Sequence, residues 1–368
     1  MTDTVYMARA LQLAAEGLYT TQPNPRVGCV IVKEGQIIGE GFHARAGQPH
    51  AEVHALQQAG KQANGATAYV TLEPCAHYGR TPPCANALIN AQVSRVVIAA
   101  LDSNPLVAGK GQAMLEAVGI STTVGVLEAE AKALNSGFFR RMAGGLPYVR
   151  VKTAASLDGR TAMQSGESKW ITGADARRDV QKWRAQSGAI VTGIGTVLAD
   201  NPSLTVRPQD WMDWRYGEVV QPKRVILDSQ LRMPLDALIL QTMGVIIVTL
   251  QSVTHIKVQQ LQALGVDVWC FESSSSLSSK INVLQVLKKL AAQGVNDVLV
   301  EAGASVAGAF VEANLVDEWI MYFAPTLLGS DAKPMFEWPI QTMAQQQKLQ
   351  IADLRIVGHD IRLIAKPR

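Results

Sequence analysis

The chain has 368 residues, of which 48% are hydrophobic and 18% are charged, and its formal net charge is +3. This composition is ordinary for a soluble globular protein, and the length favours two domains. The positive charge is thinly spread, which argues against a nucleic-acid surface, because such surfaces concentrate lysine and arginine in a stripe.

Hydropathy and cysteine content indicate the compartment. No apolar run is long enough to span a bilayer, and the first residues open an amphipathic pattern and not a signal peptide. Four cysteines are too few for a disulfide framework in a chain of this length. We therefore predict a cytoplasmic protein with no membrane partner. Cys29 and Cys270 lie in apolar, strand-like runs and are predicted to be buried free thiols.

The first part of the chain reads as alternating helices and strands. Apolar residues at helical spacing predict a helix over 4–19, and two strand-like runs, 27–32 and 36–43, flank a turn at Glu34-Gly35 that is typical of a hairpin. A helix over 50–59 follows. The remaining predicted elements are a strand at 68–72, a helix at 83–91, a strand at 93–101, a helix at 111–118, a strand at 122–127 and a helix at 128–142. Five strands interleaved with helices predict an α/β/α layered sheet.

A glycine- and proline-rich stretch at 144–147 predicts a domain boundary near residue 146. Beyond it, strands are predicted at 148–154, 189–193, 224–228, 244–250, 266–271, 297–300 and 318–324, with a hairpin at 355–365 that turns at 358–360. Helices are predicted at 174–186, 255–264, 280–293 and 305–313. These elements predict a mixed sheet of eight or nine strands flanked by helices. The serine-rich stretch 273–279 is predicted to be a surface loop.

One motif carries the chemistry of the first part. His50-Ala51-Glu52 is followed by Pro74-Cys75 and, after eight intervening residues, by Cys84. An imidazole and two thiolates suit Zn²⁺, and three protein ligands leave the fourth tetrahedral position open for water. Zinc deaminases pair such a site with a glutamate that carries protons without binding the metal, although their two cysteines are usually closer together. We therefore predict that His50, Cys75 and Cys84 bind zinc and that Glu52 carries the proton.

A closed structural site is the alternative interpretation. His77 lies between the two cysteines, and with His50, Cys75 and Cys84 it would complete a four-ligand zinc site that has no catalytic function. Glu52 would then have no role, which favours the catalytic interpretation.

Six stretches distributed along the chain match the pattern of a known family. They are TQPNPRVGCV (21–30), HAE (50–52), EPCAHYGRTPPC (73–84), VKTAASLDGR (151–160), VTGIGTVLADNP (191–202) and VEAG (300–303). With these stretches the chain resembles the bacterial bifunctional deaminase/reductase family of riboflavin biosynthesis. The resemblance implies a cytidine-deaminase-like domain over 1–145, followed by a dihydrofolate-reductase-like domain with a mixed sheet over 146–368. It also implies that the first domain deaminates 2,5-diamino-6-(5-phosphoribosylamino)pyrimidin-4(3H)-one, and that the second reduces the ribosyl group of the product to ribityl with NADPH.

The resemblance also implies contacts to the deaminase substrate. His77 and Arg80 lie in the long loop between the cysteines, where donor or positive groups suit a substrate that carries a phosphate. Asn24 and His43 are candidates for contacts to the pyrimidine or the ribose. For all four residues the alternative is a loop or turn residue with local hydrogen bonds.

The reductase half lacks the glycine fingerprint of a dinucleotide-binding fold, since Gly193-Ile194-Gly195 has no third glycine. The stretch 301–309 follows an apolar strand and opens a helix, so its N–H groups could face a phosphate; the alternative is a packed helix start rich in small residues. The resemblance implies NADPH contacts at Ala154, Trp170, Thr172, Thr196, Asp200, Ser229, Gly303, Ala304, Ser305, Val306, Ala307, Gly308 and Ala309. The implied substrate contacts are Lys152, Ser168, Arg184, Leu204, Arg207 and Glu301.

Within that set, two arginines and two other polar residues have expected roles. Arg184 and Arg207 suit the ribose phosphate, because a guanidinium binds phosphate oxygens well. Lys152 and Asp200 are the polar participants expected at the reacting carbon, and no proton donor is assigned.

Two rival functions are weaker. A nucleic-acid base deaminase would need a basic groove and stacking aromatics, whereas only 6% of the residues are aromatic. A non-catalytic binding protein stabilised by zinc is the other rival, and removal of the metal distinguishes it. The expected partner is thus a small phosphorylated pyrimidine and no nucleic acid, with a homo-oligomer left open.

Overall fold

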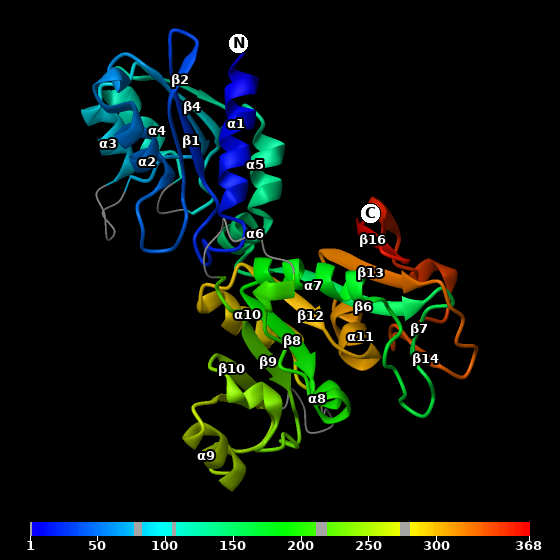
Figure 1. The fold of residues 1–368 in the computed structure, drawn as a ribbon. Coiled ribbons are helices and arrows are strands. Elements are labelled where there is room, and N and C mark those ends of the chain that lie inside the picture. The colour runs from blue at the N-terminus through cyan, green and yellow to red at the C-terminus, as the bar shows by residue number, and fades with distance from the viewer. Residues whose placement is uncertain (1, 77–82, 105–107, 211–218, 273–279) are drawn as a thin grey trace. The chain divides into compact units, whose positions relative to one another are not determined.

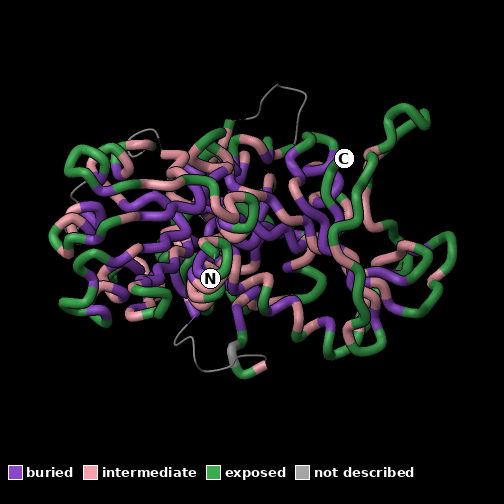
Figure 2. The backbone as a smooth tube through the Cα atoms, turned by 90° about the horizontal axis from the view of Figure 1, so that it is seen from above, coloured by how far each residue is buried: buried purple, intermediate pink, exposed green. Residues whose placement is uncertain are grey.

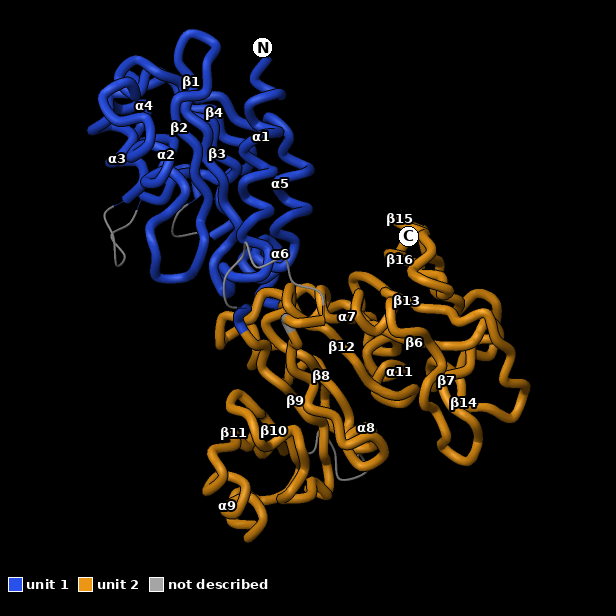
Figure 3. The backbone as a smooth tube through the Cα atoms, in the orientation of Figure 1, with its two compact units in different colours: residues 1–146, 213–220 blue, residues 147–212, 221–368 orange. Residues whose placement is uncertain are grey.

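The computed structural model describes the chain except for residues 1, 77–82, 105–107, 211–218 and 273–279. The chain divides into two compact units, residues 1–146 with 213–220 and residues 147–212 with 221–368 (Figure 3). Each unit has its own main sheet and its own hydrophobic core.

The first unit is a five-stranded sheet between two layers of helices (Figure 1). The strand order is β2-β1-β3-β4-β5; β1 is antiparallel to both of its neighbours, whereas β3, β4 and β5 are parallel. The elements are α1 (Asp3–Glu16), β1 (Gly28–Lys33), β2 (Gln36–Phe42), α2 (Ala51–Ala59), η1 (Gly60–Ala63), β3 (Thr67–Leu72), α3 (Cys84–Asn90), β4 (Arg95–Ala100), α4 (Lys110–Ala117), β5 (Ser121–Val124), α5 (Glu128–Leu134) and α6 (Ser136–Gly144). The predicted hairpin and three-layer sheet are confirmed.

Alternation along β1 separates the two cores of this unit. Cys29 and Ile31 belong to the cluster that contains residues of α2, α3 and α4, whereas Val30 and Val32 belong to the cluster that contains residues of α1, α5 and α6. Successive side chains of a strand point to opposite faces, so one apolar run supplies both layers. Cys29 is fully buried, as predicted.

The single helix predicted over 128–142 is wrong, because the chain breaks at Asn135 into α5 and α6. The buried Asn135 side chain accepts a hydrogen bond from the backbone N–H of Arg26 (2.8 Å) and donates one to its carbonyl (2.9 Å). This two-point contact ties the break to a residue at the start of the sheet. The sequence around Asn135 does not indicate that its partner is Arg26, which lies 109 positions earlier in the chain.

The second unit contains a nine-stranded mixed sheet of order β11-β10-β9-β8-β12-β6-β13-β16-β15. The strands from β11 to β13 are parallel to one another, and β16 is antiparallel to both of its neighbours, β13 and β15. Its elements are β6 (Tyr148–Ser156), β7 (Arg160–Ala162), α7 (Ala174–Gln186), β8 (Ala189–Gly193), α8 (Ile194–Asp200), η2 (Pro208–Asp210), β9 (Lys223–Leu227), η4 (Leu238–Gln241), β10 (Val245–Thr249), α9 (Ile256–Ala263), β11 (Asp267–Cys270), α10 (Val283–Ala292), β12 (Asp297–Glu301), α11 (Ala304–Glu312), β13 (Glu318–Ala324), β14 (Lys333–Pro334), η5 (Met343–Gln345), β15 (Leu349–Val357) and β16 (Asp360–Pro367). The predicted mixed sheet is confirmed.

Burial follows this order of strands. Every residue of β8, β10 and β12 is buried, as expected for parallel strands covered on both faces. Figure 2 colours the backbone by burial, with buried residues in purple and exposed residues in green. At the other end of the sheet β15 is an edge strand, and Ile351, Leu354 and Ile356 on it are 60–69% exposed. None of the helices in the described ranges is long and apolar enough to cross a membrane.

Three details of this unit differ from the prediction. The short helix α8 was not predicted, because seven residues that include a glycine give little helical periodicity. Strand β15 begins at Leu349, earlier than the predicted hairpin, because an edge strand with exposed apolar residues lacks the usual alternation. Cys270 is half-buried and not fully buried. The stretch 273–279 lies outside the described residues.

Candidate functional site

Three elements of the first unit bring His50, Cys75 and Cys84 together. His50 precedes α2, Cys75 follows β3, and Cys84 is the first residue of α3. The Nδ1 atom of His50 lies 3.2 Å from the Sγ atom of Cys84 and 3.7 Å from that of Cys75. The three candidate ligand atoms all lie within 4.8 Å of one another. One imidazole and two thiols at such distances fit the donor set of a Zn²⁺ site.

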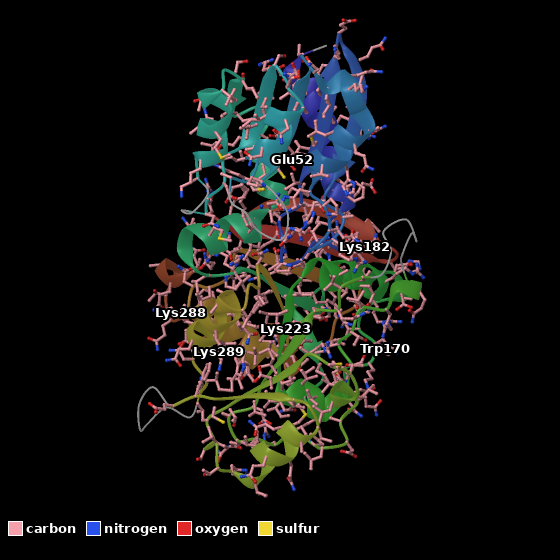
Figure 4. The ribbon with its side chains drawn as sticks, turned by 90° about the vertical axis from the view of Figure 1, so that its left-hand side faces the viewer. Glu52, Trp170, Lys182, Lys223, Lys288 and Lys289 are labelled. Carbon is pink, nitrogen blue, oxygen red and sulfur yellow. The ribbon has the colours of Figure 1, made fainter. Side chains whose placement is uncertain are left out.

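Glu52, labelled in Figure 4, interacts with all three residues of this cluster but is not one of its candidate ligands. Its side chain is in the first turn of α2 and is only 3% exposed, and burial raises its pKa to about 7. Among the described residues its Oε2 atom has no hydrogen-bond partner. A buried carboxyl group with a free oxygen, poised to titrate near neutral pH, has the properties of a proton carrier.

Strand β2 sets the position of α2 and therefore of His50 and Glu52. A Cβ atom on Gly41 would lie 2.4 Å from the carbonyl oxygen of Ala51, which is closer than any side chain permits. Glycine at this position lets the first turn of the helix lie directly on the strand.

The two thiols share the electrostatics of the cluster. The pKa of Cys75 is lowered to about 4, first by a hydrogen bond from Cys84 and also by His50, while the same contact and burial raise the pKa of Cys84. The backbone N–H of Cys84 also donates to the Sγ atom of Cys75 (3.2 Å). Cys75 is thus held as a thiolate, the form that binds metals.

Two predicted substrate contacts line the same site. The buried ring of His43 packs edge-on against that of His50, with centroids 5.1 Å apart. Its Nδ1 faces the carbonyl of Pro49 (3.2 Å), so Nδ1 carries the proton and Nε2 accepts from the amide nitrogen of Asn24 (3.0 Å). Burial lowers the pKa of His43, which keeps the ring neutral. His77 and Arg80 lie outside the described residues.

In the second unit Arg184 and Glu301 form a buried ion pair. Nε and Nη2 of Arg184 donate to the two carboxylate oxygens of Glu301 at 2.6 and 2.9 Å, and Nη1 donates to the carbonyl of Thr205 (3.1 Å). Lys152 on β6 is the registered neighbour of Glu301 on β12. Burial lowers the pKa of Lys152, and the negative charge of Glu301 opposes that shift. Three predicted substrate contacts therefore form one charged cluster.

Most of the predicted NADPH contacts lie at the carboxyl ends of neighbouring strands in the second sheet. Strands β9, β8 and β12 are parallel neighbours. Ser229 follows β9, Thr196 and Asp200 lie on α8 directly after β8, and Gly303 follows β12. The carboxyl ends of parallel strands are where open α/β sheets bind their ligands. The sheet thus brings residues that are far apart in the sequence to the same ends of its central strands, which form a candidate cofactor site.

Trp170 and Asp200 are exposed, whereas Thr172 is half-buried. The Trp170 side chain is 70% exposed, and the guanidinium of Arg177 lies 4.4 Å from the centre of its ring (Figure 4). Arg177 also donates to the carbonyl of Thr172 (2.6 Å). Asp200 pairs with the exposed Lys169 at 3.6 Å. An exposed indole braced by a cation offers a flat apolar surface to a ligand.

The helix start at 303–309 is open at one end and packed at the other. A Cβ atom on Gly303 would meet no atom within 4 Å, so a ligand can approach this residue. Ser305 instead donates to the carboxylate of Glu337, and a Cβ atom on Gly308 would lie 2.2 Å from the carbonyl oxygen of Glu337. The packed interpretation therefore holds for the part of the helix that contacts Glu337, and only the first residues leave room for a phosphate.

Arg207 lines a pocket of about 360 Å³ together with Ala174, Arg177, Arg178, Gln209 and Asp210. Its guanidinium donates to Asp210 (2.6 Å). Sequence reasoning assigned neither Arg177 nor Arg178 to a site, although they are adjacent basic residues in the first turns of α7.

The remaining two predicted contacts differ in access. Leu204 is buried in the main core of this unit, so any ligand contact falls to its backbone. Ser168 is half-buried.

The chain matches two family models. The first, the cytidine and deoxycytidylate deaminase zinc-binding region, covers residues 1–100, and the second, the RibD C-terminal domain, covers residues 147–363. Together with the two sheets and the His50–Cys75–Cys84 cluster, they define a two-domain enzyme, a zinc-dependent deaminase followed by a reductase.

Relatives match from end to end. The riboflavin biosynthesis proteins RibD of Haemophilus influenzae and Escherichia coli are 48% and 47% identical, over 100% and 99% of this chain and 98% and 99% of theirs. The Acinetobacter baumannii RibD structure has a TM-score of 0.92 at 52% identity, covering 100% of this chain and 99% of that one. A Thermotoga maritima deaminase/reductase has a TM-score of 0.85 at 32% identity with the same coverage. The chain belongs to the RibD family of bifunctional riboflavin-biosynthesis enzymes, which use zinc for deamination and NADPH for reduction.

Proposed function

We propose that residues 1–145 hydrolyse the amino group from 2,5-diamino-6-(5-phosphoribosylamino)pyrimidin-4(3H)-one, and that residues 146–368 then reduce the ribosyl group of the product to ribityl with NADPH. The observation that carries this proposal is the convergence of His50, Cys75 and Cys84 around the buried Glu52 in a chain of the RibD family. The Thermotoga maritima relative is a diaminohydroxyphosphoribosylaminopyrimidine deaminase and 5-amino-6-(5-phosphoribosylamino)uracil reductase, which supports the same pair of reactions here.

In the deaminase, His50, Cys75 and Cys84 would hold the zinc ion. When bound there, zinc would lower the pKa of a water to about 7 and so supply a nucleophile for the ring carbon that bears the amino group. The Glu52 carboxylate would take one proton from that water and give it to the ring nitrogen. It would then take the remaining hydroxyl proton as the carbonyl forms and give it to the amine, so that the carbon–nitrogen bond breaks and ammonia leaves. The free Oε2 atom of Glu52 supports this role.

Asn24 and His43 are proposed to hold the pyrimidine or the ribose next to the cluster. The neutral His43 ring is oriented by Pro49 and Asn24, so its position against His50 is well defined. His77 and Arg80 are proposed as partners of the substrate phosphate because of their place in the sequence.

In the reductase, NADPH supplies the hydride and the protein positions the two reacting carbons. We propose that Lys152, the registered neighbour of Glu301, is the polar group at the reacting carbon, because Asp200 is paired with Lys169. Arg207 and its pocket are proposed to receive the ribose phosphate.

We propose that the enzyme works in the cytoplasm. We also propose that it assembles with copies of itself, which the exposed apolar residues Ile351, Leu354 and Ile356 on the edge strand support.

Removal of zinc from the intact protein tests whether the site is catalytic or structural. We expect a chelator to abolish ammonia release while the first unit stays folded, because two apolar clusters hold its sheet independently of the metal. Hydrogen exchange of the first unit and ammonia release are the measurements, and reduction of deaminated substrate is the internal control. Unfolding of the first unit on chelation would instead support the non-catalytic zinc protein.

A further inference from the structure

Glu73 is a buried carboxylate next to the candidate zinc site for which the proposed mechanism has no use. It follows β3 directly, lies two residues before Cys75 and is 4% exposed. Among the described residues, the groups that hydrogen-bond to it are backbone N–H groups and not a charged side chain. A carboxylate buried at this point therefore needs a specific reason.

Four backbone N–H groups surround the Glu73 carboxylate. Oε1 accepts from Gly111 (2.8 Å) and Gln112 (3.3 Å), and Oε2 accepts from Asp102 (3.1 Å) and Gly109 (3.0 Å). These donors come from the end of β4 and from the start of α4, where a negative group is favoured. Each oxygen accepts two hydrogen bonds, so the side chain is held in one place.

Helix α4, whose first residues bind the Glu73 carboxylate, also packs against the backbone of the turn that carries Cys75. A Cβ atom on Gly111 would lie 2.0 Å from the carbonyl oxygen of Pro74, so α4 presses directly on the peptide before Cys75. On the other side, the carbonyl of Cys75 accepts from the N–H of Ala85 in α3 (3.2 Å). The turn is therefore clamped between two helices, and the Glu73 carboxylate fastens the α4 side.

We propose that Glu73 is a positioning residue for the metal site, which holds the Pro74–Cys75 turn in place so that the Cys75 thiolate meets His50 and Cys84. This inference rests on the proposed zinc site. It predicts that Glu73 acts on metal affinity through the backbone, without touching the metal or the substrate.

Glu73→Gln tests the proposal in the full-length protein. The amide nitrogen would face N–H donors and lose two of the four hydrogen bonds, so we expect zinc affinity, measured by competition with a chelator, to fall about 10–100-fold, the usual effect of losing an outer partner. Hydrogen exchange at the Cys75–Ala76 peptide in the metal-free protein should speed up. Excess zinc should restore most of the deamination rate.

Asp3→Asn is the matched control. Asp3 also accepts several hydrogen bonds, from Arg95 and Tyr69, but it has no contact with the turn. We expect this variant to lose stability while it keeps the parental zinc affinity. The pair separates a general loss of stability from a specific effect on the turn.

Gly111→Ala is a second variant that leaves Glu73 in place. Alanine favours a helix over glycine, but its methyl group would lie 2.0 Å from the carbonyl oxygen of Pro74, so this variant has to shift the turn. If the place of the turn does not matter to the metal, zinc affinity stays at the parental level. The proposal predicts weaker zinc binding, because the methyl group displaces Pro74. The proposal is overturned if Glu73→Gln and Gly111→Ala keep parental zinc affinity and exchange at Cys75. A Glu73→Gln protein that binds zinc with full affinity but releases no ammonia would also overturn the positioning role of Glu73. The proposed zinc site is a separate matter, and it is contradicted only if the parent protein binds no zinc.

Discussion

Glu52→Gln is expected to lower the rate of ammonia release about 10²–10⁴-fold, the usual contribution of a positioned acid/base. Glutamine keeps the size of the side chain but cannot accept and return a proton. Because Glu52 is not one of the three converging ligands, zinc content should stay at the parental level. Reduction of deaminated substrate by NADPH should also be unaffected, since the reductase residues belong to the second unit.

Glu128→Gln provides the control for this result. Glu128 makes an exposed ion pair with Lys132 on α5, so the same chemical change there should leave ammonia release at the parental rate. Zinc content by metal analysis and ammonia release are the two measurements. A Glu52→Gln protein that retains zinc and deaminates at the parental rate would contradict the assignment.

Glu301→Gln is expected to have the largest effect on the second unit. Arg184 and Glu301 are 13% and 8% exposed, and the variant leaves the guanidinium without its two-point partner. Removing one member of a buried ion pair typically costs about 3–5 kcal/mol. We expect the free energy of unfolding of the second unit to fall by about that amount. Reduction should fall as well, because Lys152 loses the neighbouring negative charge that opposes the lowering of its pKa.

Denaturant unfolding followed by tryptophan fluorescence measures this effect, because Trp183 and Trp319 belong to the second unit. Asp175→Asn is the control, since it breaks the exposed pair with Arg178, whose members are 52% and 55% exposed, and should cost about 0–1 kcal/mol. If Glu301→Gln unfolds like this control, the pair has no energetic importance. Ammonia release should be unchanged in both variants.

Local patterns in the sequence were enough for both sheets and for the zinc cluster. Alternation in β1 and β2, with a turn between them, defines the hairpin. The spacing of His50, Cys75 and Cys84 could be recognised because each ligand lies at the end of a predicted helix or strand, and such ends meet in a layered sheet.

Features that depend on distant partners could not be predicted in this way. The break at Asn135 depends on Arg26, and the pairing of Arg184 with Glu301 joins α7 to β12 across 117 positions of the chain. Nothing in the sequence indicated the role of Glu73, because the N–H groups that donate to its carboxylate lie in the loop after β4 and in α4. The burial of Leu204 likewise depends on core residues from several strands.

The central claim is that one chain deaminates first and reduces second. Its most direct test is to incubate the purified protein with 2,5-diamino-6-(5-phosphoribosylamino)pyrimidin-4(3H)-one, with and without NADPH, and to follow ammonia and NADPH together. We predict that ammonia is released without NADPH, and that NADPH is oxidised only after ammonia appears. Oxidation of NADPH by the Glu52→Gln protein on the same substrate, with no ammonia released, would contradict this order.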